Sequence, residues 1–549
     1  MKKAWYKEGV VYQIYPRSFK DSNNDGIGDL KGIIEKLDYL KELGIDIIWL
    51  SPIYESPLDD NGYDVSDYRA ILKDFGTMED FKKLVKEVHN RGMRIILDMV
   101  INHTSSEHKF FKEALSDVNS KYRDWYFFKK GKKNKLPNNW TSFFGGKAWT
   151  YNKQTDDYYL HLFAPSQPDL NWENEEVKKE FKDVLKFWLD EGVDGFRLDV
   201  INILSKREGL PNGKKRLALT GKEHYVNGPK MHQILQELNE DVFNKYDCFT
   251  VGETVLIDTK EALKYTGGDK RELDMLFSFE HTSVDTINNK WFIRKFRPYH
   301  LKKVLDKYQE ALNNKGWNTL FFENHDQPRV VSRWGDTKDY YKESAKLLAT
   351  ILFFQQGTPF IYQGQEIAMT NADFKELDEY KDVETHNIYK LGREVFHFTH
   401  KRMMKKIKYM SRDNARTPMQ WDDSKNAGFS KGTPWIRVNS NYKKINVKNN
   451  IKDKDSVYHY YKKIFALRKK YPVIVYGDYK PLFKKSRYLY AYERTLDNNS
   501  LIVISNFSKK QRKFPKLNLD DYKVILQNYK TLDNNYLKPY EARVYLKTK

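Results

Sequence analysis

Short apolar runs alternate with longer amphipathic stretches along most of this 549-residue chain. The stretches with helical periodicity include Leu30–Leu43, Met78–Arg91, Glu175–Glu191 and His300–Asn314. Eight apolar runs are expected to form strands: Val10–Tyr15, Ile45–Leu50, Arg94–Val100, Gly195–Val200, Cys248–Gly252, Met275–Phe279, Thr319–Phe322 and Pro359–Tyr362. This alternation predicts an α/β protein with a closed (β/α)8 TIM barrel. A doubly wound open sheet is the structural alternative, but the chain lacks a G-x-G-x-x-G turn.

Two segments depart from the repeat. Residues 104–171 are rich in Asn, Lys and aromatic residues and are far longer than an ordinary βα loop, which predicts an inserted subdomain over the barrel mouth. Beyond Tyr471 we expect short strands at Ser486–Arg494, Ser500–Ser505, Tyr522–Leu526 and Ala542–Leu546. These strands predict a C-terminal antiparallel β-sandwich. The predicted domains are therefore a barrel (1–103 and 172–471), an insertion (104–171) and a β domain (472–549).

Charge and cysteine content restrict the possible binding partners and the expected compartment of the protein. The formal net charge is +21, but the lysines are spread along the chain beside acidic residues, which favours a solvated surface over a nucleic-acid site. The single cysteine, Cys248, allows no intrachain disulfide, and the N-terminus is charged. No apolar run approaches the ~18 residues of a membrane span. We expect a cytoplasmic monomer that binds neither nucleic acid nor membrane.

Acidic residues follow several of the expected strands. Asp98, Asp199, Glu253 and Asp326 each come after an apolar run, and strand ends meet at one rim of a barrel. One such acid is usually a helix cap, but four of them indicate a site. Clustered carboxylates raise the pKa of at least one member, and a protonated acid beside an ionised one is what glycosidic bond cleavage requires.

Basic residues accompany these acids. Arg197 lies two positions before Asp199, so in a strand both side chains point to the same side, and its charge is expected to keep Asp199 ionised. His103 and His325 can donate hydrogen bonds to sugar hydroxyls. A histidine considered alone is more often structural, but His325 stands directly beside Asp326.

Four segments resemble the signature segments of the α-amylase superfamily of glycoside hydrolases, in the same order. They are D-M-V-I-N-H (98–103), G-F-R-L-D-V-I-N (195–202), V-G-E (251–253) and E-N-H-D-Q-P-R (323–329). Within that superfamily, Q-P-D-L-N-W (167–172), Y-Q-G-Q-E (362–366) and R-D-N-A-R-T-P-M-Q-W (412–421) resemble the oligo-1,6-glucosidase and α-glucosidase group. The resemblance covers essentially the whole chain.

The resemblance implies roles at matching positions. Asp199 would be the nucleophile, Glu253 the acid and base, and Asp326 the stabiliser of the transition state. It also implies that Asp60 pairs with Arg412 to close the pocket beyond the terminal glucose, which would make the enzyme exo-acting, and that Tyr63 stacks under the ring. The remaining substrate-binding residues would be His103, Phe163, Arg197, Val200, His325 and Arg329.

Linkage preference rests on smaller differences. In the resembling group, a valine directly after the nucleophile goes with α-1,6 cleavage, so Val200 favours isomaltose-type substrates, with α-1,4 bonds or sucrose as further substrates. Thr254 and Gln365 depart from the usual isomaltase pattern. Trehalose-6-phosphate hydrolases are the alternative within the superfamily. A catalytically inactive amylase-like partner protein is the alternative of another class, but such chains lack the catalytic acids and carry a membrane helix.

The loop 21–29 spaces acidic and amide oxygens at every second residue around a glycine. Ca²⁺ favours such oxygen ligands, although the acidic twelfth position of an EF-hand is absent. The family resemblance implies a structural calcium site here, formed by Asp21, Asn23, Asp25, Ile27 (through its carbonyl) and Asp29. An Asx-turn loop without a metal is the alternative. No organic cofactor is expected.

Overall fold

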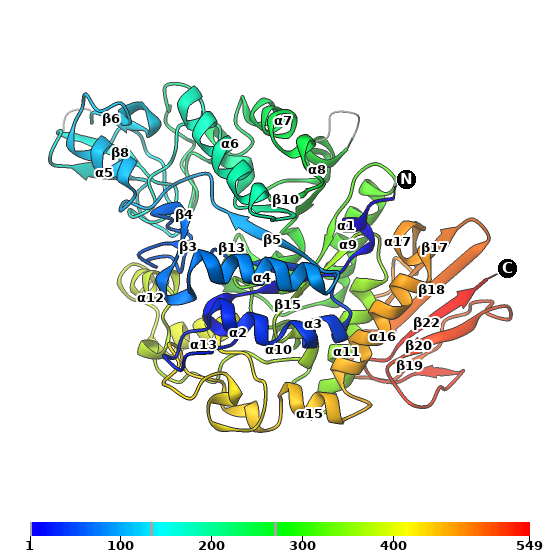
Figure 1. The fold of residues 1–549 in the computed structure, drawn as a ribbon. Helices are drawn as coiled ribbons and strands as arrows, with labels where there is room; N and C mark the ends of the chain where they lie inside the picture. Colours follow the sequence, from blue (N-terminus) through cyan, green and yellow to red (C-terminus); the bar gives the residue numbers. More distant parts are fainter. Residues whose placement is uncertain (1–2, 132–134, 268–271, 549) are drawn as a thin grey trace.

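The computed structural model of the chain describes residues 3–131, 135–267 and 272–548. Its largest sheet has eight parallel strands in the order β11-β10-β9-β5-β2-β1-β15-β14 (Figure 1). These strands are β1 (Val11–Ile14), β2 (Ile47–Leu50), β5 (Arg94–Met99), β9 (Gly195–Leu198), β10 (Phe249–Glu253), β11 (Met275–Phe277), β14 (Thr319–Leu320) and β15 (Thr358–Tyr362). The eight strands match the eight expected apolar runs.

The sheet closes on itself between β11 and β14. A parallel bridge joins Leu276 to Asn318, and the hydroxyl of Thr319 donates to the carbonyl of Leu276 at 3.0 Å. Spatial order around the closed sheet then follows chain order, which is the topology of a (β/α)8 barrel. The predicted barrel is confirmed.

Helices follow the barrel strands and cover the outside of the barrel. They are α2 (Leu30–Glu35), α3 (Leu37–Leu43), α4 (Met78–Asn90), α6 (Glu175–Asp190), α7 (Met231–Asp241), α8 (Thr259–Thr266), α9 (Pro298–Leu312), α11 (Tyr341–Phe353) and α16 (Val457–Lys470). The side chain of Thr77 caps α4 in a capping box with Asp80. The single helix expected over 30–43 is divided at Lys36, whose backbone (φ −109°, ψ 4°) leaves the helical range.

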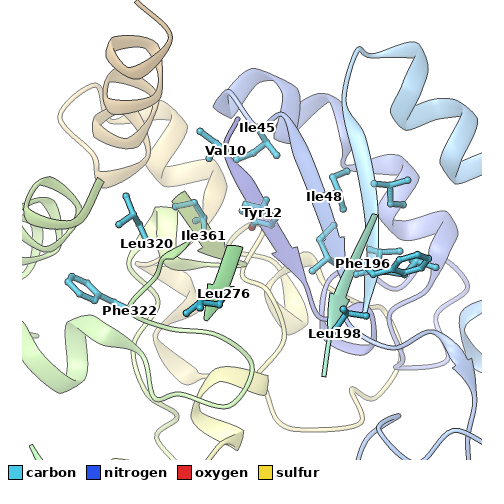
Figure 2. Packing of buried hydrophobic residues seen from close by; sticks show 14 of the residues in the cluster. Val10, Tyr12, Ile45, Ile48, Phe196, Leu198, Leu276, Leu320, Phe322 and Ile361 are labelled. Carbon is cyan, nitrogen blue, oxygen red and sulfur yellow. The ribbon is translucent and has the colours of Figure 1, made fainter. Parts of the chain in front are cut away.

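Side chains of the barrel strands alternate between two hydrophobic layers. Trp49, Ile96 and Val251 belong to the cluster inside the barrel. Residues at the alternate positions of these strands belong to the cluster between the barrel and the surrounding helices. Figure 2 shows three of them, Ile48 on β2 and Phe196 and Leu198 on β9. Because side chains alternate with a period of two residues, Asp98 and Glu253 follow Ile96 and Val251 on the inner face. Arg197, between Phe196 and Leu198, also faces inward.

The chain after β5 forms a small antiparallel sheet in the order β6-β8-β7 together with α5 (Lys109–Ser116). Its strands are β6 (Phe128–Lys129), β7 (Trp149–Asn152) and β8 (Asp157–Leu160). A bridge between His103 and Asp169 brings the ends of this segment together. Three positions of the predicted insertion, 132–134, lie outside the described residues.

Between β15 and α16 the chain adds α12 (Val383–Glu394), α13 (His400–Met410), α14 (Asp413–Arg416) and α15 (Val447–Lys452). Asp382 caps α12, because its side chain accepts from the backbone of Glu384 and Thr385. Arg412 directly precedes α14 and Arg416 ends it. This additional segment therefore supplies charged residues to the same end of the barrel as the acids.

The C-terminal region is a separate antiparallel domain, as predicted. Its main sheet has the order β16-β17-β18-β22-β20, and a two-stranded sheet, β19-β21, packs Leu537 against Ile502, Ile504 and Tyr545 of the main sheet. The strands are β16 (Asp478–Leu482), β17 (Leu489–Leu496), β18 (Asn499–Asn506), β19 (Arg512–Lys513), β20 (Lys523–Gln527), β21 (Tyr536–Leu537) and β22 (Ala542–Lys547). The opposite face packs on α11 and on α17 (Pro472–Tyr476). Within the described ranges, we find no helix with the length and apolar character that a membrane span needs.

Candidate active site

Arg197 lies at the centre of three carboxylates. Its Nη1 donates to Asp98 and to Asp199, each at 2.6 Å, and its Nη2 donates to Oε2 of Glu253 at 2.5 Å. Asp98 lies near the end of β5, Arg197 lies on β9 with Asp199 directly after that strand, and Glu253 ends β10, so three neighbouring strands supply the group. Residues that are far apart in the chain thus share one guanidinium, which places Asp199 and Glu253 side by side.

Two of the carboxyl groups that contact Arg197, those of Asp98 and Asp199, have raised pKa values. Burial raises the pKa of Asp98 to about 6 against the opposing charge of Arg197. Burial, together with the neighbouring Glu253 and Asp98, also raises the pKa of Asp199 well above its ordinary value, and Arg197 only partly offsets this. Arg197 thus favours the ionised form of Asp199, in the direction that the sequence predicts, whereas desolvation and the charges of Glu253 and Asp98 oppose it.

Asp326 belongs to a second charged group at the same site. It accepts from Nη2 of Arg416 at 2.7 Å and lies 3.5 Å from Nη1 of Arg412. Burial opposes ionisation of Asp326, but the guanidinium groups of Arg412 and Arg416 outweigh it and hold the pKa of this carboxyl below its ordinary value. The side chain is still 32% exposed, so an ionised carboxylate faces the open side of the site.

Tyr63 links the two charged groups. Its hydroxyl donates to Asp98 at 2.8 Å, and its ring stacks on the imidazole of His325 with centroids 5.2 Å apart and 7° between the planes. Nδ1 of His325 accepts from the amide of Gln13 at 2.8 Å, which leaves Nε2 to face Asp326 at 3.5 Å. Burial lowers the pKa of His325 to about 3, so the ring is neutral and can act as a hydrogen-bond donor.

His103 lies on the other side of Tyr63. Its Nε2 is 3.0 Å from the carbonyl of Tyr63, and burial lowers its pKa to about 4. Phe163, which comes from the insertion, packs 5.2 Å from the His103 ring and stacks on Phe143 at 5.0 Å. The insertion therefore brings an aromatic wall next to the charged groups.

Asp60 and Arg412 form the buried ion pair that the sequence predicts. Nη2 of Arg412 donates to Oδ1 of Asp60 at 3.0 Å, and the amide of Gln167 donates to Oδ2 at 3.2 Å. Burial raises the pKa of Asp60 to about 6, although Arg412 opposes the shift. Asp382 holds Arg412 from the other side, at 2.9 Å from Nε and 2.5 Å from Nη2.

Arg329 does not join these groups. It is fully buried, and its guanidinium donates to the carbonyls of Gln363 at 2.6 Å and Ala415 at 3.2 Å and lies over the ring of Tyr362. These contacts hold loops together behind the site. The substrate-binding role that we predicted for Arg329 is therefore replaced by a structural one, because the side chain is buried and both Nη1 and Nη2 donate to backbone carbonyls.

Sequence reasoning gave no role to three residues that the structure places here. They are Arg416, Asp382 and Gln167. Arg416 lies four positions after Arg412, the spacing that puts two side chains on one face of a helical turn, and this signal was available in the sequence. Asp382 is preceded by no recognisable motif. Asp98, which we noted only as a strand-end acid, is in direct contact with Arg197.

The loop predicted to bind calcium is closed by its own hydrogen bonds. Every carboxylate oxygen of Asp21, Asp25 and Asp29 accepts an N–H from the loop or from the start of α2. Asp21 and Asp29 are buried, whereas Asn23 and Asp25 are exposed. No cluster of three or more His, Cys, Asp or Glu side chains suited to a metal occurs in the described part of the chain. Oδ1 of Asp21 accepts two N–H groups, but each of the other carboxylate oxygens accepts one and keeps a second lone pair, so an all-oxygen cation is compatible with the loop.

A closed (β/α)8 barrel whose strand ends gather paired carboxylates around an arginine defines a class of glycoside hydrolases. Comparison with known proteins agrees. Residues 13–477 match the family model described as alpha amylase, catalytic domain. The chain therefore belongs to the α-amylase family, and it is a glycoside hydrolase.

Individual relatives match along the whole chain. It is 53% identical to an oligo-1,6-glucosidase of Parageobacillus thermoglucosidasius, with 99% of both chains covered. It is 50% identical to an oligo-1,6-glucosidase of Bacillus cereus, over 99% of this chain and 100% of that one. Among solved structures, a trehalose-6-phosphate hydrolase of Bacillus licheniformis superposes with a TM-score of 0.96 at 46% identity, with both chains fully covered.

Proposed function

We propose that this enzyme is a retaining, exo-acting α-glucosidase that hydrolyses the non-reducing terminal α-1,6 bond of short oligosaccharides such as isomaltose. The observation that carries the proposal is the contact of Asp199 and Glu253 with the same guanidinium. In retaining glycosidases the two carboxyl groups are only about 5 Å apart, because one attacks the sugar directly. Two acids held side by side by Arg197 suit this double displacement.

In the first step, an oxygen of Asp199 bonds to the anomeric carbon while the bond from that carbon to the leaving oxygen breaks. A proton passes from Glu253 to the leaving oxygen. In the second step, Glu253 takes a proton from water, whose oxygen displaces Asp199 from the anomeric carbon. Asp326, ionised and partly exposed, stabilises the positive charge that develops on the sugar ring.

The buried pair of Asp60 and Arg412 supports exo-action. Burying two charges is favourable only when their remaining hydrogen-bonding groups are satisfied, and here Gln167 and Asp382 do so. Such a pair would bind the terminal 4-hydroxyl and close the pocket to a further sugar. Val200, 6% exposed and directly after Asp199, supports the α-1,6 preference, and the names of the relatives with 53% and 50% identity agree.

We also propose a structural Ca²⁺ in the loop 21–29. Asp21, Asn23, Asp25, Asp29 and the carbonyl of Ile27 would hold it. Support comes from the two buried carboxylates of the loop, Asp21 and Asp29, and from its exclusively oxygen donors. The enzyme would act as a cytoplasmic monomer on small sugars. The single cysteine, Cys248, which allows no intrachain disulfide, supports the first part of this proposal.

The experiment that tests the proposal compares initial rates of one preparation on isomaltose, maltose, sucrose and trehalose 6-phosphate. We expect the highest kcat/KM on isomaltose. Similarity to a trehalose-6-phosphate hydrolase makes that activity the second candidate. A higher kcat/KM on trehalose 6-phosphate would replace our assignment by that one, and no hydrolysis of any α-glucoside would reject both.

A further inference from the structure

The backbone directly after Asp199 has an unusual conformation. Val200 has φ 36° and ψ 42°, in the left-handed region that a β-branched residue rarely adopts. This turn ends β9 at Leu198 and begins a short 3₁₀ turn, Ile201–Ile203. Strained residues of this kind persist only where their surroundings fix them, and they concentrate at functional sites.

The turn at Val200 directs its amide toward Glu253. The N–H of Val200 donates to Oε2 of Glu253 at 3.2 Å, the same oxygen that accepts from Nη2 of Arg197 at 2.5 Å. Glu253 is therefore held by one oxygen between two donors from the segment that carries Asp199. An acid whose proton must meet a particular oxygen of the substrate needs this kind of restraint.

The residues on either side of Glu253 pack closely against this turn. A Cβ added at Gly252 would lie 2.5 Å from Cδ1 of Leu273 and 2.8 Å from Cγ2 of Ile201, so a larger residue would displace these side chains, of which Ile201 belongs to the turn. On the far side of Glu253, the side-chain amide of Asn202 accepts from the backbone N–H of Val255 and donates to its carbonyl, both at 2.9 Å. The turn thus fastens the chain on both sides of the acid.

The insertion supports the strained turn from outside. The side chain of Val200 is buried in a cluster that contains Trp140, Trp149 and Leu162 from the inserted segment and Ile203 from the turn itself. Packing on this side opposes relaxation of φ at Val200. Because the turn cannot rotate freely, its hydrogen bonds to Glu253 and Val255 hold these two residues in place.

We infer that the turn Val200–Asn202 is a positioning device for the acid Glu253, acting through the Val200 amide and the Asn202 side chain. The inference rests on the proposed function, because it takes Glu253 as the proton donor to the leaving oxygen. Val200 and Asn202 are positioning residues: they act through Glu253. Their loss should impair protonation of the leaving group more than attack on the sugar.

The test replaces the amide between Asp199 and Val200 by an ester, with the valine side chain retained. The ester lacks the N–H that donates to Glu253 and leaves the volume of residue 200 unchanged, so linkage preference is not disturbed through the side chain. Rates are measured on aryl α-glucosides whose leaving groups range from phenol to 2,4-dinitrophenol. We expect kcat/KM to fall about tenfold more for phenol, which needs the acid, than for 2,4-dinitrophenol.

An ester at Ile203 is the matched control, since it removes the N–H that donates to the carbonyl of Val200 within the same turn and does not touch the acids. Asn202→Ala should reproduce the steeper dependence on the leaving group. The inference would be overturned if the Val200 ester lost the same fraction of kcat/KM for every leaving group. It would also be overturned if the Ile203 ester showed the same steeper dependence of kcat/KM on the leaving group. A wild-type enzyme that cleaves none of these glucosides would instead reject the proposed function.

Discussion

Oδ1 of Asp60 accepts a hydrogen bond from Nη2 of Arg412 at 3.0 Å, although the two residues lie 352 positions apart in the chain. Asp60 comes from the loop after β2, and Arg412 lies at the start of α14. Arg412 is also within 3.5 Å of Asp326. One ion pair therefore connects the end of the proposed pocket to the residue that we assign to transition-state stabilisation.

Removal of Asp60 should weaken catalysis more than folding. In Asp60→Ala, Arg412 loses one partner but keeps Asp382, and the terminal sugar loses an acceptor for its hydroxyl. We expect kcat/KM on isomaltose to fall on the order of 100-fold, which corresponds to about 3 kcal/mol, with little change in melting temperature. Asp59→Ala is the control, since the neighbouring Asp59 is exposed. A loss of equal size in both variants would argue against a specific role for Asp60.

The acid side of the pH profile should come from carboxylates. The pKa values of Asp60 and Asp98 are both raised to about 6 by burial, and that of Asp199 is raised as well. As the pH falls through about 6, Asp60 and Asp98 take up protons, so Asp60 no longer faces Arg412 as an anion and Asp98 no longer balances the charge of Arg197. We expect kcat/KM to decline in this range. His103 and His325, with pKa values of about 4 and 3, stay neutral there. A profile that stays flat down to pH 5 would contradict this account.

Arg416 should matter through its planar guanidinium. Its Nη2 binds Asp326 at 2.7 Å, and its Nε donates to the carbonyl of His325 at 3.2 Å. Lysine carries the same charge but cannot make both contacts from a fixed fork. We expect Arg416→Lys to lower kcat at least tenfold, on the order of 1–2 kcal/mol. Arg437→Lys, which changes an exposed ion pair with Asp373 and Glu379, should retain wild-type kcat.

The calcium proposal predicts a change in stability and none in the chemistry. Chelator should lower the melting temperature of the wild-type enzyme, and added Ca²⁺ should restore it. Asp21→Ala should melt at a lower temperature than wild type and no longer respond to either addition. Because Asp21 also accepts three backbone N–H groups, the lower melting temperature alone is not diagnostic. An equal melting temperature of the wild-type enzyme with and without chelator would show that no metal is bound in this loop.

The fold was predictable from the sequence because buried parallel strands are short and almost wholly apolar. The runs around Ile48 and Phe196 carry this signal, and the helices between them carry the period of 3.6 residues. The predicted end of β9 at Val200 was wrong by two residues. Propensity places valine in strands, whereas tertiary contacts force Val200 into the left-handed region.

The site was predictable where acids end strands and less so elsewhere. Asp98, Arg197 and Glu253 follow from alternation along β5, β9 and β10, because the period fixes which side chains face the barrel axis. Asp382 and Gln167 lie in long connections after β15 and in the insertion, where no period relates sequence to position. The raised pKa of Asp199 also required the structure, since desolvation depends on what surrounds the carboxylate.

The proposed double displacement requires that Asp199 forms a covalent bond with the glucosyl group. The most direct measurement inactivates the enzyme with 5-fluoro-α-glucosyl fluoride, digests it with pepsin and locates the attached sugar by mass spectrometry. We predict a single labelled peptide whose modified residue is Asp199, and no label in Asp199→Asn. A sugar attached to Glu253 or Asp326, or turnover of isomaltose with inversion at the anomeric carbon, would contradict the account.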